Sequence, residues 1–106
     1  MKQRINFRGI NSAAVRMLPL LLMRWLPDGK RIANEFVARN PTRNDTKAGS
    51  FKIALSGAKA GVWSDFATGD SGSDPISLAA YLHNLSQGEA ARQLAQMLDI
   101  KPEVEQ

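Results

Sequence analysis

Residues 50–66, SFKIALSGAKAGVWSDF, set the fold class of this 106-residue chain. Phe51, Ile53 and Leu55 lie on one side of an alternating pattern and Lys52 on the other, as in a strand with one buried face. Glycines bracket a short connection at 57–61, and the next five residues, VWSDF, predict a second strand. The stretch therefore predicts a β-hairpin.

The chain after this hairpin predicts two helices. Residues 69–73 are expected to form a tight polar loop, and Asp74 followed by Pro75 is a typical helix start. Ser86 and Glu89 have the spacing of a capping box. They predict a final helix with an inward face made of Ala90, Leu94, Met97 and Leu98.

The chain before the hairpin predicts one helix and one strand. Residues 12–26, with Ser12 as N-cap, carry apolar side chains at helical spacing. Pro19 either kinks this helix or marks a helix that starts near Met17, with the proline in its first turn. Residues 31–38 predict a strand.

These elements predict an α+β fold with an N-terminal helix, a small antiparallel sheet and two C-terminal helices. The length fits one domain, which we expect to span residues 1–100, with the helix 12–26 packed on a core formed by 31–98. Residues 101–106 are expected to be a flexible tail.

The composition excludes several classes of protein. The chain has no cysteine and one histidine, so thiolate and multi-histidine metal sites are excluded. We find no nucleophile–base pair and no catalytic carboxylate pair, so we expect no enzyme activity, no metal and no cofactor. The apolar run at 17–23 is too short to span a bilayer and has no cleavage site, which favours a cytoplasmic protein.

The charge is distributed unevenly along the chain. Residues 1–52 hold eleven Lys or Arg against three acids, a net +8, whereas residues 53–106 hold three against seven, a net −4. Bases gathered in one half favour a nucleic-acid partner, and an ordinary solvated surface is the alternative.

One run of motifs resembles a known family. Asn-Pro-Thr-Arg (40–43), Gly-Ser-Phe (49–51), Trp-Ser-Asp-Phe-Ala-Thr-Gly (63–69) and Ser-x-x-Glu-Ala (86–90) follow in this order. The run resembles the N-terminal zinc-ribbon domain of bacterial and phage DNA primases, in a degenerate form similar to the leading segments of plasmid- and prophage-encoded primase–helicase proteins. The resemblance covers roughly residues 39–98.

The resemblance places the two zinc-ligand pairs at Asn40 and Arg43, and at Asp65 and Thr68. None of these provides a thiolate or an imidazole, so the tetrahedral zinc site cannot form. Our hypothesis is that side-chain hydrogen bonds replace the metal, formed among Asn40, Arg43, Asp45 and Asp65.

The resemblance implies a DNA-binding module without catalysis that holds single-stranded template during replication priming. The basic side chains that we expect to contact phosphates are Arg39, Arg43, Lys47 and Lys52. Lys30 and Arg31 are expected to extend this DNA-binding surface, and a solvated turn is the alternative for these two. An internal ion pair of Arg43 with Asp45 or Asp65 is the alternative for that residue. Trp63 and Phe66 should face opposite sides of their strand, and Trp63 is the candidate for stacking on bases.

A protein–protein adaptor is the alternative function. It would dock a primase or helicase through the first helix and have no DNA binding of its own. An exposed apolar patch around Leu18, Leu22 and Trp25 would favour it.

Overall fold

The computed structural model describes residues 4–43 and 49–104. It confirms the α+β class, with helices before and after an antiparallel sheet. In chain order the elements are α1 (Phe7–Arg16), α2 (Leu18–Trp25), β1 (Lys30–Ile32), β2 (Glu35–Ala38), β3 (Phe51–Ala54), the 3₁₀ turn η1 (Gly57–Lys59), β4 (Trp63–Asp65), β5 (Asp70–Gly72), α3 (Pro75–His83) and α4 (Gln87–Met97).

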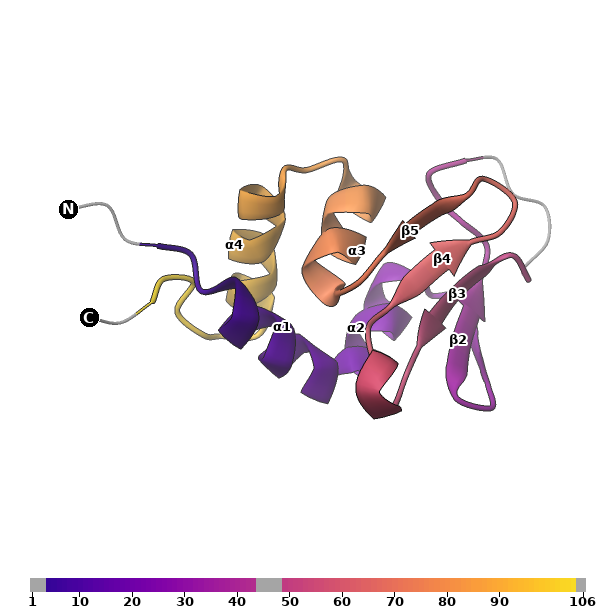
Figure 1. Ribbon diagram of the computed structural model, residues 1–106, viewed down its shortest axis with the longest axis horizontal. Helices are drawn as coiled ribbons and strands as arrows, with labels where there is room; N and C mark the ends of the chain where they lie inside the picture. Colours follow the sequence, from indigo (N-terminus) through magenta and orange to yellow (C-terminus); the bar gives the residue numbers. More distant parts are fainter. Residues whose placement is uncertain (1–3, 44–48, 105–106) are drawn as a thin grey trace.

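The sheet is a meander in which each strand pairs antiparallel with the next, in the order β1-β2-β3-β4-β5. The hairpin predicted from residues 50–66 is confirmed as β3 and β4, with η1 as its connection and Ile53 opposite Trp63. Figure 1 shows α1, α3 and α4 gathered at one end of the molecule and the sheet at the other.

The interior contains two apolar clusters joined by α2 and α3. At the helical end, Leu21 of α2 and Ile76 of α3 pack with α1 and α4. At the sheet end, Leu18 and Leu22 of α2 and Leu78 of α3 pack on one face of the sheet. Both helices are therefore buried on two sides, and they fix the sheet relative to the helical end.

Both predicted capping signals after the sheet are confirmed. Asp74 accepts the backbone N–H of Ser77 at 2.8 Å and begins α3 with Pro75 in its first turn. Ser86 and Glu89 form a reciprocal pair at 3.0 and 3.1 Å that begins α4. Local side-chain chemistry thus sets both helix starts.

The single helix predicted at 12–26 is wrong, because the segment belongs to two helices. Helix α1 begins at Phe7, where the side chain of Asn6 accepts the Gly9 N–H, and it ends before Met17. Helix α2 then starts with Pro19 in its first turn, which is the second of the two arrangements expected for that proline. The break turns Leu18, Leu22 and Leu26 toward the sheet.

The single strand predicted at 31–38 is also wrong, because a tight turn at Ala33 and Asn34 divides it into β1 and β2. Ala33 adopts φ of +55°, a left-handed conformation that favours glycine. The sequence has no glycine or proline here to signal the turn.

Two segments expected to be irregular are paired instead. The predicted loop at 69–73 contains the edge strand β5, which pairs with β4. In the predicted flexible tail, Ile5 and Glu103 form an antiparallel bridge, Pro102 C=O accepts the Asn6 N–H at 2.8 Å, and Arg92 pairs with Glu103 at 3.7 Å. Residues 101–104 are thus held against the start of the chain.

We predict that Ala33→Gly stabilises the protein by up to about 1 kcal/mol, because glycine removes the cost of a left-handed alanine. Chemical denaturation monitored by circular dichroism measures the change. Ala58→Gly is the matched control, since Ala58 is also exposed but has no positive φ. A loss of stability in Ala33→Gly equal to that in the control would contradict the prediction.

Candidate nucleic-acid interface

A buried carboxylate lies where the sheet meets α3. Asp65 is the last residue of β4 and is 1% exposed. Its Oδ2 accepts the Asn40 side-chain amide at 2.8 Å and the Arg43 Nε at 3.1 Å, and its Oδ1 accepts the Ala67 N–H at 2.9 Å. The charge is therefore paired and both oxygens are satisfied, as burial requires.

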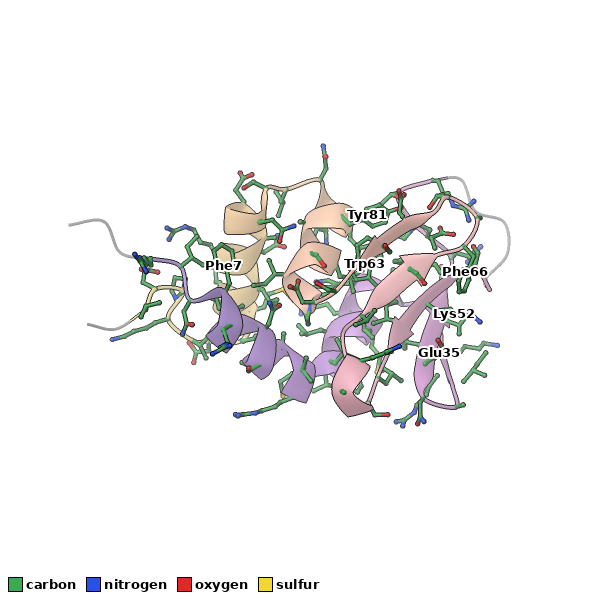
Figure 2. All side chains as sticks on the ribbon, in the orientation of Figure 1. Phe7, Glu35, Lys52, Trp63, Phe66 and Tyr81 are labelled. Carbon is green, nitrogen blue, oxygen red and sulfur yellow. The ribbon has the colours of Figure 1, made fainter. Side chains whose placement is uncertain are left out.

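Tyr81 of α3 extends this network toward solvent. Its hydroxyl accepts the Asn40 amide at 2.8 Å and donates to Asp70 of β5 at 2.7 Å. Its ring lies 4.6 Å from that of Trp63, centroid to centroid. Figure 2 labels both side chains, which lie between the sheet and α3. Sequence reasoning missed Tyr81, whose position in a helix gave no signal of a polar contact to the sheet.

The network controls the ionisation of Asp65. Burial by itself raises the pKa of this carboxyl, but hydrogen bonds from Asn40, Arg43 and the Ala67 amide outweigh burial and lower the pKa from 3.8 to about 2. Asp65 is thus ionised at neutral pH, and its charge is balanced by the Arg43 guanidinium.

The predicted hydrogen bonds among Asn40, Arg43 and Asp65 are confirmed. Thr68, the fourth position that the resemblance singled out, donates its backbone N–H to the Asp65 carbonyl at 3.3 Å. Asp45, the remaining member of the hypothesis, lies outside the described residues. The described residues contain no cluster of three or more His, Cys, Asp or Glu that could hold a metal ion.

The side of the sheet away from α2 and α3 is here called the outer face. Cross-strand neighbours share a face, so the register places one row across it, composed of Lys30, Val37, Lys52, Ser64 and Ser71. Their neighbours along the strands, such as Phe36, Ile53 and Trp63, point into the core.

Phe66 lies beside this row and is the most exposed large apolar side chain among the described residues, at 74%. The Lys52 ammonium stands 5.7 Å from its ring centroid, within cation–π range. Figure 2 shows Phe66 and Lys52 near each other, on the side of the sheet away from the helices.

The prediction that Trp63 stacks on bases is wrong. Trp63 is 3% exposed and packs against Phe51 and Tyr81, and its Nε1 donates to the Ser77 hydroxyl at 3.0 Å. Gly72 opposite leaves room for the indole that a Cβ would fill. The expected opposite orientations of Trp63 and Phe66 are confirmed. Trp63 is the residue that faces the core, and Phe66 is the exposed one.

The basic residues predicted to contact phosphates do not all lie on one face of the sheet. Lys30 and Lys52 share the outer face, whereas Arg31 lies on the side of Phe36, at the exposed edge strand. Arg39, just after β2, is exposed and pairs with Asp28 at 2.8 Å. Lys30 and Lys52 thus provide positive charge on the outer face, whereas the charge of Arg39 beside it is offset by Asp28.

Arg43 is engaged inside the protein and is not part of the outer face. Arg43 follows the internal alternative, since its guanidinium binds both Asp65 oxygens and the Ser50 hydroxyl. Lys47 lies outside the described residues, so its predicted contact stays a prediction.

The apolar patch expected around Leu18, Leu22 and Trp25 is wrong. Leu18 and Leu22 are fully buried against the sheet, and Trp25 is half-buried. No helix in the described ranges 4–43 and 49–104 has the length and apolar character to cross a membrane.

Comparison of the chain with protein-family models, with curated proteins and with solved structures found no match. The candidate interface therefore stands on the sequence and on the geometry of the outer face.

We predict that Asp65→Asn lowers the free energy of unfolding by about 3 kcal/mol, because it leaves a half-buried arginine without its counter-charge. The wild-type protein should lose stability as pH falls from the ordinary carboxyl pKa of 3.8 to about 2, since the folded state binds the Asp65 proton less readily than the unfolded state. Denaturant titrations across this pH range measure both effects.

Asp28→Asn is the matched control, since Asp28 also pairs with an arginine but is exposed. It should change stability little and keep the acid-induced loss. The same steep loss in Asp65→Asn as in the wild type would show that other groups cause it.

Proposed function

We propose that this chain is a non-catalytic module that binds single-stranded DNA on the outer face of its sheet. The observation that carries the proposal is the Phe66–Lys52 pair, an exposed aromatic ring next to a cation on the outer face of the sheet. Such pairs combine a surface for base stacking with a contact for the neighbouring phosphate.

The exposed ring favours a single strand over a duplex. A base must leave its own helix before it stacks on a side chain, and each such stack is worth about 1–3 kcal/mol. With Phe66 74% exposed, one ring face can receive a base while Lys52 remains at the other side or edge.

The charges suggest the path of the strand. Lys30 and Lys52 lie in one row across β1 to β3, and Arg39 lies beyond the end of β2. Glu35 is on the outer face at the opposite end of β2 and repels phosphate. The backbone would thus follow the lysine row toward Phe66, and each contacted phosphate would release counterions.

We further propose that this binding serves replication priming in the cytoplasm, next to a primase or helicase of a plasmid or phage. Support comes from the four positions that the resemblance pairs with zinc ligands. Asn40, Arg43 and Asp65 are hydrogen-bonded, and Thr68 bonds the backbone of Asp65. If the resemblance holds, these hydrogen bonds join the positions at which the family has its zinc ligands.

We predict that Phe66→Ala weakens binding of a labelled oligothymidylate by about tenfold, and that Lys52→Glu weakens it and reduces the log–log salt slope by about one or more. Fluorescence anisotropy at several salt concentrations measures both affinities. Wild-type binding to a duplex of the same length should be weaker, because its bases are not free to stack.

Phe7→Ala and Arg8→Glu are the matched controls. Phe7 is an exposed aromatic on α1, at the other end of the molecule from the sheet in Figure 2, and Arg8 is exposed beside it. Equal losses of affinity in the test and control variants would show that the protein binds DNA only by non-specific attraction to its net charge. No binding of the wild-type protein at low salt would refute the proposal.

A further inference from the structure

Helix α2 and the residue before it, Met17, carry a row of apolar side chains that point to solvent. Met17, Leu20 and Met23 follow one another at intervals of three residues and are 43%, 60% and 61% exposed. They lie on the side of α2 opposite to Leu18 and Leu22, which pack on the sheet. The DNA-binding proposal does not use this surface.

The row borders a groove between α2 and the C-terminal end of α4. One hollow, of about 380 Å³, is lined by Met17, Leu20, Leu21, Arg24, Met97 and Leu98. A second, of about 390 Å³, shares Arg24 and Met97 and adds Trp25, His83 and Gln93. We call the two together the α2–α4 groove.

The lining of this groove favours a helical occupant. Two methionines, Met17 and Met97, line it, and Met23 is exposed one turn along from Leu20. Unbranched thioether side chains adapt to different apolar shapes and are typical of surfaces that receive amphipathic helices.

The charges favour an acidic occupant. Among the residues that the structure describes, no carboxylate lines either hollow, and Arg24 lines both. Helices α1 and α2 contain Arg8, Arg16 and Arg24 and no acidic residue. A second copy that presented its own α1 or α2 would bring arginine to arginine, so charge disfavours self-association through these helices.

We propose that the α2–α4 groove binds an amphipathic helix of a partner protein. Its apolar side chains, three or four residues apart, enter the two hollows, and an aspartate or glutamate on its flank pairs with Arg24. Since the groove and the outer face of the sheet lie on different sides, such a partner leaves the proposed DNA surface free.

The test uses two blocked synthetic helices of about four turns with the same leucines, one with glutamate and one with lysine at the flanking positions. The full chain should bind the glutamate peptide about tenfold more tightly than the lysine peptide. Leu20→Asp and Met23→Asp should each weaken this binding about tenfold or more, and Arg24→Glu should reverse the preference between the peptides.

Ile32→Asp is the matched control, because Ile32 is as exposed as Leu20, at 58% against 60%, and lies in β1 away from the groove. It should bind the glutamate peptide as the wild type does, and circular dichroism should show all variants folded. Equal affinity for both peptides, or no effect of Leu20→Asp, would overturn the proposal. A wild-type dimer that Leu20→Asp converts to monomer would overturn it in favour of a second copy.

Discussion

The arrangement of the sheet end depends on one buried charge, the carboxylate of Asp65. A carboxylate inside a small protein must be paired and hydrogen-bonded, or it makes the folded state unstable. Asn40 and Arg43, after β2, and the Ala67 amide, after β4, provide these bonds. The requirement therefore fixes the ends of two strands that are not adjacent in the sheet, and Tyr81 carries the connection to α3.

The packing of the sheet and of α2 determines which surfaces of the protein remain exposed. The inner face of the sheet is occupied by α2, α3 and the polar network, so the outer face is the side on which we expect a ligand. Helix α2 likewise uses one side for the sheet and another for α1, α3 and α4, which leaves the row from Met17 to Met23 uncovered. The domain, with its two apolar clusters, thus exposes two chemically different surfaces. The outer face of the sheet is basic and aromatic, and the exposed side of α2 is apolar with a basic edge.

The sequence indicated which residues belong to the candidate site, but it indicated little about which of their side chains face solvent. Alternation indicated that Trp63 and Phe66 face opposite ways, but it carries no information on which side the helices cover. The indole is buried because Tyr81 of α3 and Phe51 of β3 pack against it and Gly72 leaves room for it, and all three lie outside its own strand. The role of Arg43 was open for the same reason, since its partner Asp65 is 22 residues away.

By itself, the sequence determined the elements whose signals are local. The alternation of 51–55 and the caps at Asp74 and Ser86 define β3, α3 and α4, because each depends on contacts within a few residues. Only the tertiary structure decided the turn at Ala33, the strand β5 and the pairing of Ile5 with Glu103, which lack local signals and gain their stability from neighbouring segments. It also decided which aromatic ring meets solvent, because burial is a property of packing and not of any one stretch of chain.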